Sequence, residues 1–290
     1  MRRVDIQLAD ALVRLTGASR SELTSILAEP WAYYRRAPIP KKDGTFRVIR
    51  APSESLKAIQ RELLRRRLSA LDVHPASHCR SRRSIITNAR KHQHQRYVSA
   101  YDLHAAFPST TPRMVREALL REGFDPTQAN AIKELCTLRG ELPQGAPTSP
   151  ALLSIVLRSM DDALGKEASR QGLVYTRYMD DLFVSGDRRS PSFDRVLRDQ
   201  VERAGYRLAR DKIRRWGPTG RRPTLTGIVL GSSLAPTQEF ATSVAKMVRD
   251  VEAGTVRLTE NERRSLEGRI AFVQALSPGE GMRLRARLVN

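Results

Sequence analysis

The sequence has 290 residues, 40% of them hydrophobic, with a mean hydropathy of -0.45. This composition is that of an ordinary globular protein able to bury a sizeable core in one large or two modest domains. Lys and Arg number 51 against 31 Asp and Glu, and the resulting net charge of +20 predicts a polyanionic partner. The alternative is a well-solvated basic surface. A membrane-surface role is disfavoured because the basic residues are spread through the chain.

Three further classes of protein are disfavoured. The longest uncharged stretch, residues 142–157, contains three prolines and would make a poor membrane helix. The N-terminus has early arginines but no long apolar run, so we expect no signal peptide. Cys79 and Cys136 are the only cysteines, which argues against a disulfide framework and fits a cytoplasmic protein.

The first part of the chain predicts helices around a hairpin. Apolar residues recur at helical spacing over residues 8–15, and a capping pattern opens a second helix over residues 19–30. Asp43-Gly44 lies between two short apolar runs, which is a hairpin signal. Residues 53–71 then carry one apolar stripe, with the arginines largely off it, and predict a longer helix.

The middle and end of the chain alternate irregularly between strands and helices. We expect strands over residues 96–101, 173–184 (two, around a tight turn) and 224–230. We expect helices after Thr111 and Asp125, and over residues 150–168, 194–205 and most of the chain beyond Phe240. Without regular alternation the pattern indicates an α+β fold rather than a doubly wound sheet.

Three carboxylates carry the strongest chemical signal. Asp102 ends an apolar predicted strand, and Asp180 and Asp181 lie in the turn of a predicted hairpin. Carboxylates beside buried strands are costly unless they are exposed or neutralised, and their oxygen atoms could hold a pair of Mg²⁺ ions. A solvated turn is the alternative. The pair Asp161-Asp162 lies within a helical pattern, and no chemistry is assigned to it.

The carboxylates lie in boxes that resemble those of reverse transcriptases. Residues 178–181 resemble the Y-x-D-D box, residues 142–150 the LPQGxxxSP box, residues 102–107 the box of the first metal ligand, and residues 39–49 the fingers hairpin. Ala106 departs from the family, in which a second aromatic residue often stands. The resemblance implies an RNA-directed DNA polymerase with a right-hand fold and an antiparallel palm sheet. The bounds it implies are an N-terminal helical segment 1–36, fingers 37–95 and 112–149, palm 96–111 and 150–232, and a short helical thumb 233–290.

The same resemblance assigns roles around the dNTP. Lys41 and Arg47 would bind its triphosphate, and Phe107 would press against the sugar. Gln144 and Gly145 would line the nascent base pair, and Lys212 would protonate the leaving pyrophosphate. The alternatives are that Lys41 and Arg47 are solvated charges of a hairpin and that Phe107 is a core aromatic residue. Gln144 and Gly145 could equally form a simple turn, and Lys212 could be one basic residue among many.

Two shorter elements resemble retron reverse transcriptases in particular: residues 88–92, with Asn88 and His92, and residues 225–227, with Thr226 and Gly227. Leu225 stands where the family has valine. The resemblance implies RNA contact at these residues and a structured noncoding RNA as template. It also implies priming from an RNA 2′-hydroxyl to give branched RNA–DNA, and anti-phage defence with an effector protein. The alternatives are a turn cap at Asn88, a solvated loop at His92 and ordinary strand-end residues at 226–227.

Three other interpretations remain open. A basic RNA-binding protein without catalysis would explain the charge but not the three acids. Another polymerase of the same fold, of the intron type or a template-independent defence enzyme, would share the catalytic boxes. A zinc site is disfavoured because His74, His78 and Cys79 lack a regular zinc spacing.

Overall fold

The computed structural model describes residues 5–40, 44, 46–79 and 82–289. The chain folds into two compact units. The first comprises residues 1–84, 101–183 and 190–213, and the second comprises residues 85–100, 184–189 and 214–290. These units cut across the predicted fingers, palm and thumb, whose bounds stay a prediction.

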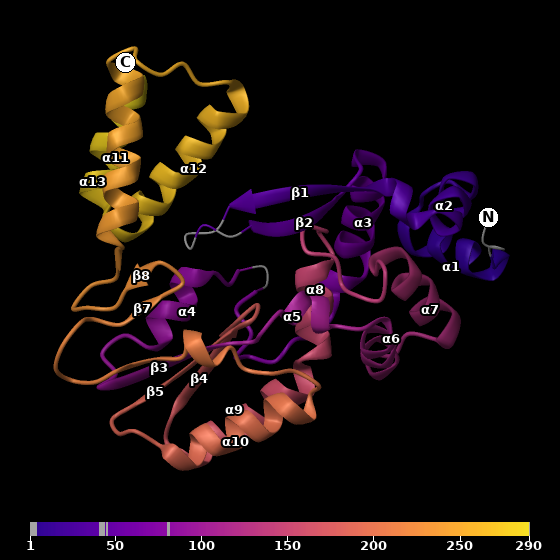
Figure 1. Ribbon diagram of the computed structural model, residues 1–290, viewed down its shortest axis with the longest axis horizontal. Coiled ribbons are helices and arrows are strands. Elements are labelled where there is room, and N and C mark those ends of the chain that lie inside the picture. The colour runs from indigo at the N-terminus through magenta and orange to yellow at the C-terminus, as the bar shows by residue number, and fades with distance from the viewer. Residues whose placement is uncertain (1–4, 41–43, 45, 80–81, 290) are drawn as a thin grey trace. The chain divides into compact units, whose positions relative to one another are not determined.

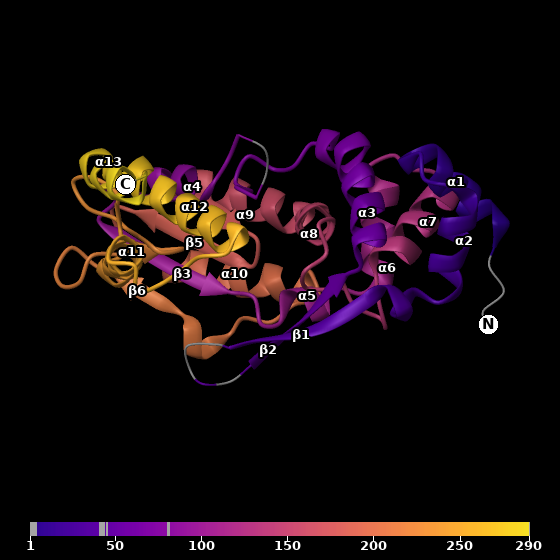
Figure 2. The same cartoon turned by 90° about the horizontal axis from the view of Figure 1, so that it is seen from above.

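Helices make up much of the first unit (Figures 1 and 2). They begin where polar side chains cap free backbone N–H groups. Thr111 and Asp125 cap two of them ahead of a proline at the first helical position, as the sequence predicts. The α-helices of this unit are α1 (Ile6–Thr16), α2 (Arg20–Ala28), α3 (Glu54–Arg66), α5 (Ala106–Ser109), α6 (Pro112–Arg121), α7 (Pro126–Cys136), α8 (Ser149–Val156), α9 (Arg158–Gln171) and α10 (Pro191–Arg203). Its 3₁₀ turns are η1 (Pro30–Tyr33), η2 (Leu68–Ala70) and η3 (Arg210–Lys212).

The predicted hairpin of this unit is confirmed. Strands β1 (Tyr34–Pro40) and β2 (Phe46–Pro52) pair antiparallel, with Tyr34 opposite Pro52 and Pro40 opposite Phe46. Asp43 lies outside the described residues. Figure 1 shows the two strands side by side, and their place in the fingers stays a prediction.

A four-stranded sheet has the order β4-β5-β3-β6. Its strands are β3 (Tyr97–Asp102), β4 (Val174–Tyr178), β5 (Asp181–Gly186) and β6 (Arg214–Trp216). β3 pairs antiparallel with β6, which the sequence did not predict. β3 and β5 each contribute residues to both units.

The helix predicted over residues 150–168 is two helices, so that prediction was wrong in one respect. The backbone at Leu157 has ψ of 0°, and this separates α8 from α9. Neither glycine nor proline stands at residue 157, so the sequence carries no local signal of the break.

The second unit ends in a helical bundle (Figure 1). Its elements are α4 (Ile85–Lys91), β7 (Thr224–Leu225), β8 (Ile228–Val229), β9 (Ala235–Pro236), α11 (Gln238–Glu252), α12 (Glu260–Leu276) and α13 (Pro278–Val289). Val244, Leu266, Ile270, Val273 and Leu284 pack into one buried core, so the last three helices stabilise one another.

The strand predicted over residues 224–230 is instead a tight hairpin. Thr226 and Gly227 join β7 to β8, and both have positive φ, of 47° and 84°. Two consecutive positive φ angles make a type I′ turn, whose twist matches the flanking strands. Threonine is β-branched and uncommon at positive φ. The sequence therefore predicted a continuous strand here and not a turn.

Candidate active site

The predicted acids gather at one end of the strands that carry them. β3 ends at Asp102, whose carbonyl oxygen accepts a hydrogen bond from the Ala209 N–H at 2.8 Å. The N–H of the next residue, Leu103, donates to the carbonyl oxygen of Asp180 at 3.0 Å. This bond joins the end of β3 to the turn before β5, so that Asp102 and the pair Asp180-Asp181 share one site in the first unit.

The electrostatics of the site show that its carboxylates lie close together. The pKa of Asp181 is raised to about 7, chiefly by burial and then by the charges of Asp180 and Asp102, while Lys212 opposes the rise. Like charges raise a carboxyl pKa only at short range. Asp102 and Asp180 therefore lie close enough to Asp181 to act on its carboxyl group, and the roles of the three acids in catalysis and metal binding stay predictions.

Lys212 belongs to the same cluster. Its Nζ atom donates to both carboxylate oxygens of Asp102, at 3.1 Å each, and the Asp102 side chain is 17% exposed. Lys212 lies in η3, held by a hydrogen bond from its N–H to the carbonyl oxygen of Ala209 at 3.0 Å. The cation thus lies where it offsets the acids, and its role as a proton donor stays a prediction.

The donor chemistry of the site fits divalent cations. Asp102, Asp180 and Asp181 offer only oxygen atoms, the ligands that Mg²⁺ prefers. Burial and then the charges of Asp180 and Asp102 raise the pKa of Asp181, and a bound cation would offset the repulsion between these carboxylates. Across residues 5–40, 44, 46–79 and 82–289, however, no three His, Cys, Asp or Glu side chains are already arranged to hold a metal ion.

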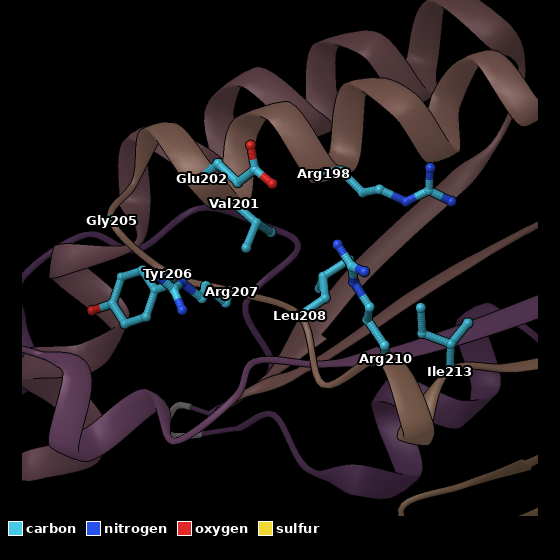
Figure 3. Close-up of a pocket in the computed structure, with 9 residues that line it drawn as sticks. All are labelled: Arg198, Val201, Glu202, Gly205, Tyr206, Arg207, Leu208, Arg210 and Ile213. Carbon is cyan, nitrogen blue, oxygen red and sulfur yellow. The ribbon is translucent and has the colours of Figure 1, made fainter.

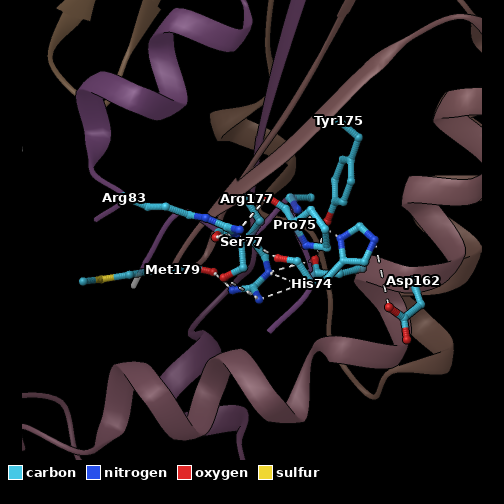
Figure 4. A network of polar contacts seen from close by, with 10 residues as sticks. His74, Pro75, Ser77, Arg83, Asp162, Tyr175, Arg177 and Met179 are labelled. Carbon is cyan, nitrogen blue, oxygen red and sulfur yellow. Dashed lines mark hydrogen bonds and ion pairs between the residues drawn. The ribbon is translucent and has the colours of Figure 1, made fainter. Parts of the chain in front are cut away.

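The turn that carries Asp180 is anchored by a buried ion pair that the sequence analysis missed (Figure 4). Arg177 and Asp161 are both fully buried, and Nη2 of Arg177 lies 2.6 Å from Oδ2 of Asp161. Nη1 of Arg177 donates to the carbonyl oxygen of Met179 at 2.8 Å, and Met179 has a positive φ of 54°. Arg177 therefore holds the unusual backbone conformation from which Asp180 follows.

The surroundings of the pair satisfy its remaining polar groups. Tyr175 donates its hydroxyl to Oδ1 of Asp161 at 2.8 Å. The N–H and carbonyl of Arg177 bond to Ala76 and His78, at 2.8 Å each. Burial opposes the charged form of Arg177, but Asp161 raises the pKa of Arg177 above its ordinary value. Arg177 is consequently charged and paired with Asp161 inside the protein.

A sequence signal for Asp161 did exist. Its neighbours at helical spacing, Leu157, Leu164 and Ala168, are all buried, so Asp161 stands on the apolar face of α9. An acid in that position needs a buried partner. Asp162, the next residue, has a side chain 46% exposed. The two members of the Asp161-Asp162 pair therefore differ in role, which the sequence analysis did not separate.

The LPQG segment lies against the hairpin. The carbonyl oxygen of Gln144 accepts from the N–H of Arg50 on β2 at 2.8 Å. Gly145 has φ of 118°, and a Cβ atom there would lie 3.3 Å from the carbonyl oxygen of Arg50. Arg50 also pairs with Glu141. A glycine is therefore required both by the backbone angle and by the close approach of β2.

We expect Gly145→Ala to destabilise the protein by about 2 kcal/mol, because it combines a left-handed backbone with a tight contact. Gly123→Ala is the matched control. Gly123 has φ of 87°, but nothing lies within 4 Å of its Cβ position, so only the backbone cost applies. Urea unfolding of both variants measures the difference. Equal losses of stability would show that the contact with β2 contributes nothing.

The other predicted dNTP residues are placed only in part. Phe107 is 6% exposed in α5, and its carbonyl oxygen accepts from the N–H of Leu142 at 3.3 Å, which links the first metal box to the LPQG segment. Lys41 lies outside the described residues. The backbone of Arg47 pairs with Ile39 across the hairpin. Sugar selection and triphosphate binding by these residues stay predictions.

The retron elements lie in the second unit. Asn88 and His92 are 0% and 1% exposed, and Nδ1 of His92 lies 2.7 Å from Oγ of Ser185 on β5. His92 is thus a buried residue that ties α4 to the sheet, and the alternative of a solvated loop is wrong for it. Thr226 and Gly227 form the hairpin turn described above. RNA contact at these four residues stays a prediction.

One cavity of the first unit adds basic residues that the sequence analysis did not select (Figure 3). It has a volume of about 700 Å³, and Arg198, Arg207 and Arg210 line it together with Glu202. The segment that carries these arginines also pairs with the site, because Leu208 forms a β-bridge with Leu103. Anionic groups near the acid cluster would therefore find cations here.

Comparisons with known proteins agree with this geometry. The family model described as reverse transcriptase (RNA-dependent DNA polymerase) matches residues 39–219. The retron Mx162 reverse transcriptase of Myxococcus xanthus is 32% identical, over 99% of this chain and 67% of its own length. The retron Mx65 reverse transcriptase of the same organism is 33% identical, over 98% of this chain and 71% of its own length.

A solved structure supports the fold alone. Apo telomerase from Candida tropicalis superposes with a TM-score of 0.54 at 9% identity, over 88% of this chain and 57% of the telomerase chain. The right-hand polymerase fold expected from the sequence is confirmed by this likeness and by the family match. The chain belongs to the reverse transcriptase family, as an RNA-directed DNA polymerase of the bacterial retron type.

Proposed function

We propose that this enzyme copies a cognate structured noncoding RNA into DNA, with two Mg²⁺ ions held by Asp102, Asp180 and Asp181. The observation that carries the proposal is the acid cluster, in which burial and two neighbouring carboxylates raise the pKa of Asp181 to about 7. Bound divalent ions supply activation of the attacking hydroxyl group and stabilisation of the leaving pyrophosphate.

The chain's own residues position the reactants. Lys212, whose Nζ atom donates to Asp102, would give a proton to the leaving pyrophosphate. Gly145 lets the backbone of the LPQG segment approach a base pair. Lys41 and Arg47 bind the triphosphate, and Phe107 excludes a 2′-hydroxyl. Fingers, palm and thumb follow the bounds given for the sequence, with the bundle α11–α13 holding the duplex.

The names of the relatives support a finer proposal. Both are retron reverse transcriptases, and the resemblance of residues 88–92 and 225–227 to retron elements argues for the same template class. We therefore infer priming from an RNA 2′-hydroxyl, a branched RNA–DNA product and a defence role with an effector protein. Within the described ranges no helix is both long enough and apolar enough to cross a membrane.

The first experiment is sequencing of the nucleic acid that copurifies from the native host, beside primer extension on an RNA template. We expect one branched RNA–DNA species, and dNTP incorporation that EDTA abolishes and Mg²⁺ restores. Incorporation without any branched species would replace the retron product by that of another reverse transcriptase. RNA binding with no incorporation at any divalent ion would leave the non-catalytic alternative.

A further inference from the structure

A basic groove of about 990 Å³ lies within the second unit, and none of the residues assigned a role above lines it. Segments from three parts of the chain form it: residues 96–97, 187–189 and 215–221. We call it the arginine groove and define it by its basic and aromatic residues, Arg96, Tyr97, Arg188, Arg189, Arg215, Trp216 and Arg221.

The sheet brings these segments together. Tyr97 is the first residue of β3, and β6 pairs with that strand through Val98 opposite Trp216 and Ser99 opposite Arg215. Arg188 and Arg189 follow the end of β5. Tyr97, Arg215 and Trp216 therefore lie on paired strands, and the other four arginines lie in the segments next to the sheet.

An aromatic ring holds two of the guanidinium groups. The Cζ atoms of Arg96 and Arg189 lie 6.0 Å and 5.8 Å from the centroid of the Tyr97 ring. Cation–π contacts at these distances keep cations near an aromatic face. Tyr97 thus orients two positive charges that would otherwise repel one another.

The groove lacks matching negative charge. Asp187 is the one acid among its lining residues, against five arginines. Across the described ranges, no carboxylate forms an ion pair with Arg96, Arg188, Arg189 or Arg221. Arg96, Arg188 and Arg189 are exposed. Clustered exposed arginines of this kind bind phosphate groups, which they can contact in a bidentate manner.

We propose that the arginine groove binds a single-stranded polynucleotide, with phosphates on the arginines and a base stacked on Trp216. Aromatic side chains within a basic groove are the arrangement that single strands require, because every base has a face that can stack. A duplex would offer phosphates but no free base face. Under the proposed function, the strand is an unpaired part of the template RNA or of the DNA product.

Trp216 makes the groove directly observable. The chain has two tryptophans, and the other, Trp31, is 54% exposed in the first unit. In a Trp31→Phe background the emission therefore comes from Trp216 alone. Without dNTPs, titration with twenty-nucleotide polyuridine or polythymidine should quench this emission, and the stronger ligand identifies the RNA or DNA source.

The arginines are tested in the same background. Arg188→Ala/Arg189→Ala should weaken the quenching midpoint roughly tenfold and reduce the slope of log affinity against log salt by about 1.4, as two lost phosphate contacts predict. Arg195→Ala/Arg203→Ala on α10 is the matched control, since it removes the same charge from exposed positions of the first unit. Its midpoint should change much less.

Three results would overturn the inference. The first is unchanged Trp216 emission at concentrations at which fluorescence anisotropy of the labelled strand shows full binding. The second is an equal loss of affinity in both double variants. The third is equal quenching by polyglutamate or by a twenty-base-pair RNA duplex. These results leave DNA synthesis untested, and failed DNA synthesis leaves these titrations valid.

Discussion

Asp181→Asn should reduce dNTP incorporation by a factor of a thousand or more, and Asp180→Asn should do the same. Each substitution replaces one carboxylate of the cluster that also contains Asp102 and that, in the proposed function, binds the metal ions. Divalent ions stabilise a transition state for nucleotidyl transfer by several kcal/mol, and a loss of about 4 kcal/mol is a thousandfold. Primer extension on an RNA template at saturating Mg²⁺ measures the effect.

A control substitution and a measurement of RNA affinity show whether the loss of incorporation is specific to Asp180 and Asp181. Asp162→Asn removes a carboxylate whose side chain is 46% exposed on α9, and it should leave incorporation within about twofold, as surface substitutions usually do. RNA affinity should be retained by all three variants, because the acids do not contact the polyanion favourably. Full activity of Asp180→Asn or Asp181→Asn would exclude these acids from catalysis and reopen the choice of site.

The acids could be predicted because their signals are local. Asp102 ends an apolar strand, and the pair Asp180-Asp181 lies between two further apolar strands. The pattern of apolar residues along the sequence was therefore enough to predict that the three acids lie at strand ends. Gly145 was likewise marked by its residue type, since a left-handed backbone next to a second chain segment favours glycine.

The features that could not be predicted from the sequence depend on contacts between segments that are distant along the chain. Arg177 and Asp161 lie on a strand and a helix, and only the packed fold shows that both are buried against each other. The break at Leu157 has no glycine or proline, and the turn at Thr226 places a β-branched residue at positive φ. In each case tertiary packing overrides the local preference from which the prediction was made. The same holds for β6, whose three residues are a strand because β3 lies beside them.

Removal of one member of the buried ion pair should be the most destabilising change in the first unit. In Arg177→Met, the Asp161 carboxylate stays buried. Of the hydrogen bonds described above, it keeps the one from the Tyr175 hydroxyl and loses those from Arg177. Breaking a buried pair in this way costs about 3–5 kcal/mol. It also frees the carbonyl oxygen of Met179, whose positive φ then lacks support. Urea unfolding should show the loss of stability, and primer extension should show reduced turnover in the folded fraction.

Removing both charges of the ion pair separates its effect on stability from its effect on turnover. Arg177→Met/Asp161→Leu removes both charges, so it should recover most of the stability, because apolar replacements of a buried pair are often neutral or stabilising. It does not restore the hydrogen bond to Met179, so turnover should stay low. Arg170→Met, which breaks an exposed pair with Glu167, should cost about 1 kcal/mol or less. If the double variant regains both stability and turnover, the ion pair serves folding alone. If it regains stability only, Arg177 is a positioning residue that sets the backbone from which Asp180 reaches the site.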